Sequence, residues 1–182
     1  LGHAVLCAKN FIGNEPFAVL YGDDVILSDV PATKQLCDAY EKYGKGVVGV
    51  KEVPGLAITK YCSLKTEHIE ENCYKCTDMI EKPKPEEIMG NFSILGRVVL
   101  PPEIFDVLEN TPLGAGNELQ LTDAMKTLAQ TDGVVAVEYE GKRYDMGNKF
   151  GILEANIEVG LKHPETKEEL KDYIKKIAEN LD

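Results

Sequence analysis

Two adjacent carboxylates, Asp23 and Asp24, follow the apolar segment 17–21 and Gly22. A continuous apolar run of this kind is typical of a strand that is buried on both faces of a parallel sheet. Ligands of open parallel sheets bind beyond the carboxyl ends of the strands, where these two side chains would lie. Carboxylate oxygens bind hard cations such as Mg²⁺, so the pair is a candidate metal site. A polar turn after a strand is the plainer alternative.

A third acidic residue, Asp145, ends the predicted short strand 142–145 and precedes Gly147. We expect it at the same rim of the sheet as Asp23, although about 120 positions separate the two residues. Two carboxylates at one rim could share one ion. The alternative is that Asp145 only caps a helix or a turn.

A candidate cation for phosphate chemistry is Lys82, which lies between Glu81 and Pro83. The proline restricts the preceding residue, so we expect extended geometry at Lys82 and an ammonium that is held in place. An ammonium aimed at a metal-bound phosphate suits phosphoryl or nucleotidyl transfer, which depends largely on positioning and charge neutralisation. A solvated loop of lysines and prolines is the alternative.

The segment 114–118 contains two glycines and ends in Glu118. It lacks the third glycine and the Lys-Ser or Lys-Thr pair of the known phosphate-binding loops, so it is neither a Walker nor a Rossmann fingerprint. We interpret it as a loop that lets backbone approach a ligand, with Glu118 available for hydroxyl groups.

The five cysteines are odd in number and have apolar neighbours, which favours reduced thiols in a cytoplasmic protein over a disulfide framework. Cys73 and Cys76 have the spacing of half a zinc site, but no second pair accompanies them, so two thiols in a strand is the simpler interpretation. The three histidines show no spacing that suggests a catalytic triad or a ligand set.

The chain has 182 residues, with 20 Lys and Arg against 31 Asp and Glu, and a formal net charge of −11. Phosphate backbones are bound by clustered basic residues, so this charge argues against a nucleic-acid partner. It also argues against the RNA-templated polymerases, whose metal motif resembles the Tyr-Gly-Asp-Asp sequence at 21–24. No apolar run approaches the ~20 residues that a membrane span needs, and the length suits a single domain, 1–182.

Strands and helices are predicted to alternate along the chain, which indicates an α/β protein. Apolar runs predict strands at 17–21, 46–50, 97–100 and 134–139. Apolar residues at helical spacing predict helices over 36–43, 104–108 and 121–128, from about 149, and within the terminal segment 165–182.

Several helix ends carry their own signals in the sequence. Gly44 follows the first predicted helix and is typical of a C-terminal cap. Thr122 is a possible N-terminal cap of the helix near 121–128. Thr166 and Glu169 have the spacing of a capping box for the terminal helix.

Taken in order, these segments resemble the bacterial UTP–glucose-1-phosphate uridylyltransferases. Each motif is modest alone, but their joint order and spacing are specific, and they run nearly the whole length of the chain. The motifs are LGHAVLCA at 1–8, FAVLYGDD at 17–24, IEKPKP at 80–85, ILGR at 94–97, GAGNELQLTDA at 114–124 and GKRYDMGNKFG at 141–151.

The resemblance implies a nucleotide-diphospho-sugar transferase fold, a Rossmann-like mixed sheet with flanking helices. It also implies a reaction in which UTP and α-D-glucose 1-phosphate give UDP-glucose and pyrophosphate by Mg²⁺-assisted in-line attack on the α-phosphorus. The family's enzymes often assemble as dimers or tetramers, so the resemblance further implies a homo-oligomer.

The resemblance also implies roles for individual residues. Asp23 and Asp145 would hold the ion, and Lys82 would contact phosphate oxygens. Asp24 and Glu81 would bind sugar hydroxyls. The resemblance further places Gly2 near the uracil base.

Two of the chain's departures from the family bear on activity. The family begins with a strand and a Gly-rich loop whose basic residues hold the triphosphate, and neither precedes Leu1, so we expect an N-terminally incomplete domain. Cys62 stands where the family usually has a glycine whose backbone approaches the sugar. One alternative is therefore a catalytically incompetent sugar-nucleotide-binding or scaffolding fragment of the same fold, and another is a sibling enzyme for a different nucleotide or sugar.

Overall fold

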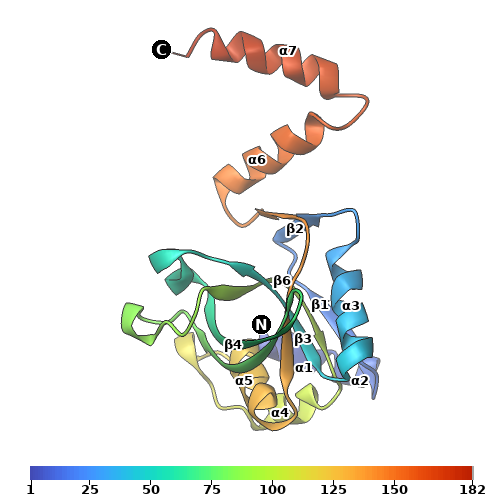
Figure 1. The fold of residues 1–182 in the computed structure, drawn as a ribbon, viewed down its shortest axis with the longest axis vertical. Helices are drawn as coiled ribbons and strands as arrows, with labels where there is room; N and C mark the ends of the chain where they lie inside the picture. The colour runs from blue at the N-terminus through green and yellow to red at the C-terminus, as the bar shows by residue number, and fades with distance from the viewer. Residues whose placement is uncertain (182) are drawn as a thin grey trace.

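The computed structural model describes residues 1–181, which form a mixed six-stranded sheet, a separate two-stranded ladder and flanking helices (Figure 1). The order of the large sheet is β1-β6-β3-β7-β5-β4, and β3 and β7 run parallel, whereas the other neighbours are antiparallel. Its strands are β1 (Phe17–Leu20), β3 (Gly46–Glu52), β4 (Cys62–Glu70), β5 (Cys73–Glu81), β6 (Phe92–Leu100) and β7 (Val134–Glu138). The small ladder pairs β2 (Asp24–Leu27) with β8 (Lys142–Asp145).

Helices cover both faces of the large sheet, as the predicted α/β alternation requires. Side chains alternate between the faces of a strand, so Val48 and Val47 of β3 belong to different cores. The core that contains Val48 includes α1 (Gly2–Cys7), α4 (Ile104–Asn110) and α5 (Leu121–Thr131), and the other core includes α3 (Ala32–Tyr43). The remaining short elements are α2 (Lys9–Ile12), η1 (Gly55–Lys60), η2 (Pro85–Glu87) and η3 (Ala115–Asn117).

The interpretation of segment 17–21 as a parallel strand buried on both faces is wrong. β1 lies at the edge of the sheet and pairs antiparallel with β6. Its residues alternate between half-buried and exposed: Phe17 stacks on Phe105 of α4, whereas Leu20 is 53% exposed. Both faces of this run are apolar in the sequence, but β6 is its one hydrogen-bonded neighbour and only one face reaches the core.

The helix-end predictions had mixed outcomes. Gly44 ends α3 in the left-handed conformation, with its N–H donating to the Tyr40 carbonyl at 2.8 Å, as predicted. Thr122 is not a cap, since Gln120 occupies the N-cap of α5. Thr166 occupies the N-cap of the terminal helix, but its hydroxyl donates to the Gly160 carbonyl at 2.8 Å and the predicted capping box does not form.

The last two helices extend away from the sheet (Figure 1), and we call them the arm: α6 (Lys149–Gly160) and α7 (Lys167–Ala178). The arm follows β8 along the chain. Its helices begin at Lys149 and Lys167, which confirms the helices predicted from about 149 and within 165–182. Throughout residues 1–181, no helix has both the length and the apolar character that crossing a membrane requires.

Candidate active site

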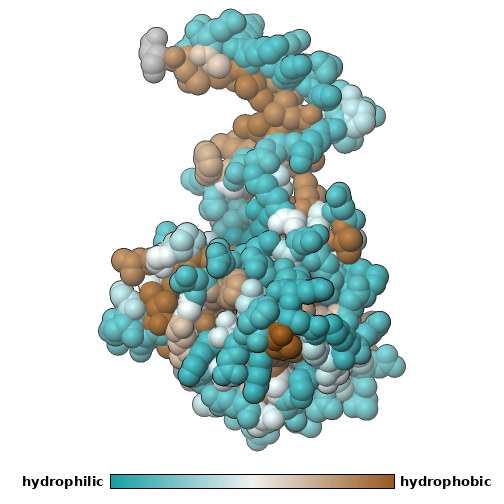
Figure 2. Space-filling model, viewed as in Figure 1, coloured by the Kyte–Doolittle hydropathy of each residue, from teal (hydrophilic) through white to brown (hydrophobic). Residues whose placement is uncertain are grey.

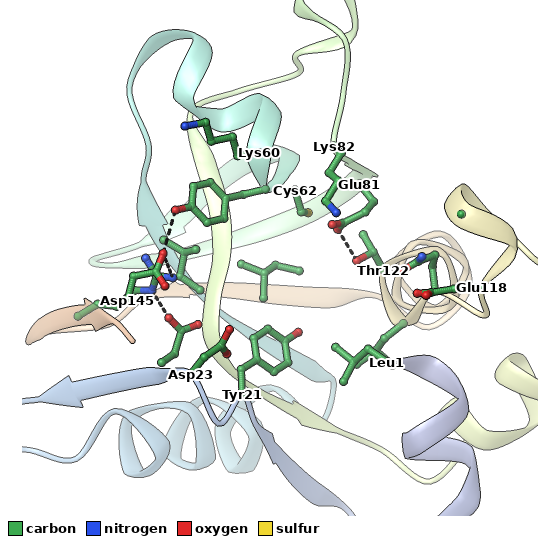
Figure 3. A pocket seen from close by; sticks show the side chains of 18 residues that line it. Leu1, Tyr21, Asp23, Lys60, Cys62, Glu81, Lys82, Glu118, Thr122 and Asp145 are labelled. Carbon is green, nitrogen blue, oxygen red and sulfur yellow. Dashed lines mark hydrogen bonds and ion pairs between the residues drawn. The ribbon is translucent and has the colours of Figure 1, made fainter. Parts of the chain in front are cut away.

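A cavity of about 590 Å³ lies between the β2–β8 ladder, the ends of β4 and β5, and the start of α5 (Figure 3). It collects side chains from segments that are far apart in the sequence. Six of the seven residues predicted for the site line it: Asp23, Asp24, Glu81, Lys82, Glu118 and Asp145. The seventh, Gly2, does not.

Gly2 serves the packing of α1 instead of facing the cavity. It is buried, and its N–H donates to the Leu119 carbonyl at 3.0 Å. A Cβ at this position would meet that carbonyl oxygen at 2.7 Å, so the absence of a side chain allows the close approach. Its neighbour Leu1 lines the cavity in its place.

One side of the cavity, which we call the carboxylate wall, consists of Asp23, Asp24, Tyr61, Arg143 and Asp145. The β2–β8 ladder places Asp24 opposite Asp145, and the N–H of Met146 donates to the Asp23 carbonyl at 2.7 Å.

The carboxylates of Asp23 and Asp145 meet at Gly147. The Gly147 N–H donates to Asp145 Oδ1 at 2.9 Å. A Cβ on this glycine would lie 3.1 Å from Asp145 Oδ1 and 3.2 Å from Asp23 Oδ2, so the carboxylates of both residues flank one glycine. The structure therefore brings together the two acidic residues that the sequence places about 120 positions apart.

Asp24 is held within the protein by a buried ion pair. Arg143 Nε donates to Asp24 Oδ1, and the two side chains are only 17% and 5% exposed. Burial raises the pKa of the Asp24 carboxyl, and the adjacent guanidinium opposes this rise. Arg143 thus engages one oxygen of Asp24, a residue that also lines the cavity.

Arg143 and Tyr61 also hold Asp145. Arg143 Nη2 lies 3.6 Å from Asp145 Oδ2, and the Tyr61 hydroxyl donates to the same oxygen at 3.3 Å. The guanidinium lies 5.6 Å from the centre of the Tyr61 ring. The sequence analysis missed both residues. Arg143 and Asp145 share one face of β8, which is a usable signal, whereas nothing local to Tyr61 indicates its role.

The opposite side of the cavity, which we call the lysine wall, consists of Cys62, Glu81, Lys82, Glu118 and Thr122 (Figure 3). Thr122 Oγ1 donates to Glu81 Oε2 at 2.9 Å. Among residues 1–181, no carboxylate lies within ion-pair distance of the Lys82 ammonium. The lysine wall therefore has far fewer internal contacts than the carboxylate wall.

The expected extended geometry at Lys82 is wrong. Its φ is +46°, in the left-handed region that residues with a side chain rarely adopt. The Lys82 N–H donates to the Tyr61 carbonyl at 2.7 Å, directly beyond the Cys62–Glu81 pair of the β4–β5 ladder. This bond outweighs the local preference that Pro83 imposes, and it anchors the lysine backbone at the cavity.

Cys62 is almost completely buried at the cavity, and burial raises the pKa of its thiol. The thiol is therefore protonated at neutral pH and takes up space without adding charge. Cys73 and Cys76 both lie in β5, as the strand interpretation predicts, and all five cysteines are free. Lys60, which the sequence analysis did not single out, is a second lysine that lines the cavity.

Comparisons with known proteins identify the family of this chain. The family model described as nucleotidyl transferase matches residues 1–160. The UTP–glucose-1-phosphate uridylyltransferase of Staphylococcus epidermidis is 49% identical over 177 residues, which are 97% of this chain and 62% of the relative. The enzyme of the same name from Bacillus subtilis is 45% identical over 97% of this chain and 60% of its own length.

A solved structure of UDP-glucose pyrophosphorylase complexed with UDP-glucose superimposes with a TM-score of 0.86 at 41% identity. It covers 90% of this chain and 63% of the solved chain. The chain thus spans about 62% of the length of the relatives it matches. The resemblance to bacterial uridylyltransferases and the predicted mixed α/β fold are confirmed. This chain belongs to the nucleotidyl transferase family.

Proposed function

We propose that this chain carries the metal-binding and sugar-phosphate-binding part of an enzyme that joins UTP and α-D-glucose 1-phosphate into UDP-glucose and pyrophosphate. The observation that carries the proposal is the meeting of Asp23 and Asp145 in one cavity that Lys82 also lines. The names of the relatives support the choice of substrates. We expect the enzyme to act in the cytoplasm, where its five free cysteines would stay reduced.

The proposed reaction does not require a general base. The phosphate of the sugar phosphate is already an anion, so the reaction requires that its repulsion from the triphosphate be cancelled and that it approach the α-phosphorus in line. Lys82 and Lys60 both line the cavity and are available to offset phosphate charge. This requirement agrees with a cavity that no histidine of residues 1–181 lines.

Enzymes of this family generally use a divalent metal ion, and Asp23 and Asp145 fit Mg²⁺. Mg²⁺ is usually held by one or two protein carboxylates together with water and substrate phosphates. The described residues contain no cluster of three or more Asp, Glu, His or Cys arranged for a metal, which suits this mode of binding. Bound there, Mg²⁺ would stabilise negative charge on the phosphates.

The side chains around the proposed ion have separate tasks. Arg143 and Tyr61 orient Asp145 through the contacts described above, and Gly147 leaves room for both carboxylates. Across the cavity, Glu81 and Glu118 are the acceptors available for sugar hydroxyls, and Thr122 fixes the direction of Glu81.

A second candidate function is a sugar-nucleotide-binding or scaffolding protein without turnover. The buried Cys62 side chain favours it, because the thiol occupies space in the cavity near Glu81. An enzyme for another nucleotide would share the same site and would show a preference for dTTP, CTP or GTP.

The test is pyrophosphate release from UTP and glucose 1-phosphate. It is measured with this chain alone and with the chain joined to the remaining segment of its Staphylococcus epidermidis relative, which we call the extended chain. Release that disappears in Asp23→Asn and Asp145→Asn supports the enzyme. Tight binding of UDP-glucose in calorimetry, without release from the extended chain, would instead favour the scaffold.

A further inference from the structure

Tyr21 lines the cavity but belongs to neither the carboxylate wall nor the lysine wall. It directly follows β1, and Figure 3 shows its hydroxyl directed into the cavity, between the two walls. Within residues 1–181 this hydroxyl forms no hydrogen bond. The phenol is therefore available to a ligand that enters the cavity.

The backbone of Tyr21 is fixed on both sides, in contrast to its free hydroxyl. The Tyr21 N–H donates to the Gly96 carbonyl at 2.9 Å, which continues the β1–β6 ladder one residue beyond Leu20. The Tyr21 carbonyl accepts from the Asp24 N–H at 3.1 Å. The ring packs against the core that contains Val48, and the side chain is half-buried. The hydroxyl is thus held in place before a ligand binds, which lowers the cost of binding to it.

Three titratable groups lie near the Tyr21 phenol: Cys62, Glu81 and Asp24. Burial raises the pKa of the phenol, and these three groups raise it further. The phenol is therefore protonated at neutral pH and able to donate a hydrogen bond. Both carboxylates accept hydrogen bonds from other side chains, and the sulfur of a thiol is a weak acceptor.

A ring hydroxyl of a sugar suits this arrangement. Such a hydroxyl donates one hydrogen bond and has two lone pairs that accept, so an acceptor and a donor together satisfy it. The ionised carboxylates of Glu81 and Glu118 only accept, whereas the phenol of Tyr21 also donates. Tyr21 therefore complements the acidic residues of the lysine wall.

We propose that Tyr21 determines sugar specificity by donating a hydrogen bond to a ring hydroxyl of glucose whose own proton is directed to Glu81. The proposal rests on the proposed function and extends it, because the resemblance to the family assigns sugar hydroxyls to Asp24 and Glu81 and gives Tyr21 no role. A sugar that lacks this hydroxyl displaces water from the phenol without replacing the lost hydrogen bond, so the site rejects it.

Calorimetry with the extended chain tests the proposal. The ligands are UDP-glucose and its analogues that each lack one secondary hydroxyl of the glucose ring. We expect UDP-glucose to bind Tyr21→Phe about tenfold more weakly than the parent, because a hydrogen bond is lost. One analogue should bind Tyr21→Phe at least as tightly as the parent, because phenylalanine leaves no donor unsatisfied. The preference for UDP-glucose over that analogue should therefore fall by about tenfold.

Binding of UDP alone separates the sugar from the rest of the ligand. UDP has no glucose ring, so it should bind the parent and Tyr21→Phe equally. If Tyr21→Phe weakens UDP as much as UDP-glucose, the phenol contacts the nucleotide or its phosphates and the proposal is wrong.

Tyr139→Phe is the matched control variant. It also removes a buried phenol hydroxyl that lacks a partner among the described residues, but Tyr139 does not line the cavity. Tyr173→Phe is a second control on the arm, where apolar side chains gather (Figure 2) and a separate groove shares no residue with the cavity. Both variants should keep the preference of the parent. Circular dichroism checks that all three variants are folded.

A preference for one hydroxyl that only Tyr21→Phe reduces supports the proposal. A parent that binds UDP-glucose and every analogue equally overturns it, as does a Tyr21→Phe variant that keeps the full preference of the parent. An extended chain that shows the Tyr21-dependent preference but releases no pyrophosphate would contradict the proposed enzyme while supporting the role of Tyr21. An extended chain that does not bind UDP-glucose would overturn both.

Discussion

The two walls of the cavity are built in opposite ways. In the carboxylate wall, Arg143 links Asp24 to Asp145, and Tyr61 and Gly147 supply further hydrogen bonds to Asp145. In the lysine wall, the Thr122 hydroxyl donates a hydrogen bond to the Glu81 carboxylate. The Lys82 ammonium has no ion-pair partner within residues 1–181.

This difference separates groups that must be fixed from groups that must be available. A preorganised charge stabilises a transition state without reorganising during the reaction, which suits the wall proposed to hold the ion. Groups that bind substrate are better left without protein partners, because any such partner would have to be displaced. We therefore expect substitutions in the carboxylate wall to affect stability and rate together, and those in the lysine wall to affect rate alone.

The largest effect should follow from Asp145→Asn. The asparagine keeps the acceptor for the Gly147 N–H but removes the charge, so the fold should survive while pyrophosphate release by the extended chain falls by at least ~100-fold. Asp29→Asn, at an exposed aspartate outside the cavity, should leave the rate unchanged. Rates of Asp145→Asn close to those of the parent would contradict the proposed role.

Arg143→Met should cause the largest loss of stability, because it leaves the buried Asp24 carboxylate without its partner. Removing one member of a buried pair costs about 3 kcal/mol or more in the free energy of unfolding, which urea denaturation would measure. Lys142→Met is a matched control one residue earlier in β8. Its ion pairs with Glu154 and Glu158 are exposed, so its loss should be much smaller.

The pH dependence of this loss sharpens the prediction. Burial already raises the pKa of Asp24, and Arg143→Met removes the guanidinium that opposes this rise. Protonation of Asp24 in the folded state then removes the buried charge as the pH falls. The difference in unfolding free energy between Arg143→Met and the parent should therefore shrink in acid, and a difference that grows in acid would contradict the buried-pair interpretation.

In the lysine wall, Lys82→Met should slow pyrophosphate release by about tenfold or more, because an ammonium opposite the phosphates is lost. The free energy of unfolding should change little, since this ammonium forms no ion pair within residues 1–181. Equal loss of stability in Lys82→Met and Arg143→Met would remove the distinction between the two walls.

The smallest effect should come from Tyr61→Phe, which removes one hydrogen bond to Asp145 and should cost about 1 kcal/mol in unfolding free energy. Tyr139→Phe is its control. The Tyr139 hydroxyl is buried without a hydrogen-bond partner among the described residues, so its removal should be neutral or slightly stabilising. A larger loss of unfolding free energy in Tyr139→Phe than in Tyr61→Phe would contradict the hydrogen bond between Tyr61 and Asp145.

The features that could be predicted from the sequence depend on local chemistry. Gly44 ends α3 because a left-handed residue is needed there, and the apolar stripe of α5 is buried because its spacing matches one helix face. Asp23 and Asp145 were found because each follows or ends a predicted strand, although the antiparallel β2–β8 ladder, and not the rim of a parallel sheet, brings them together.

The features that were mispredicted depend on partners that are distant in the sequence. Lys82 departs from extended geometry because its N–H donates to the Tyr61 carbonyl. The edge position of β1 follows from its pairing with β6. No local pattern specifies these contacts, and the same reason explains why Tyr61 was missed.

The central claim is that Asp23 and Asp145 hold one divalent ion. Titration of Mn²⁺ into the extended chain with UDP-glucose, followed by electron paramagnetic resonance, tests it directly, because Mn²⁺ takes the same oxygen ligands as Mg²⁺. The account predicts one site that both Asp23→Asn and Asp145→Asn abolish and that Asp29→Asn retains. Unchanged Mn²⁺ binding in both cavity variants would contradict it.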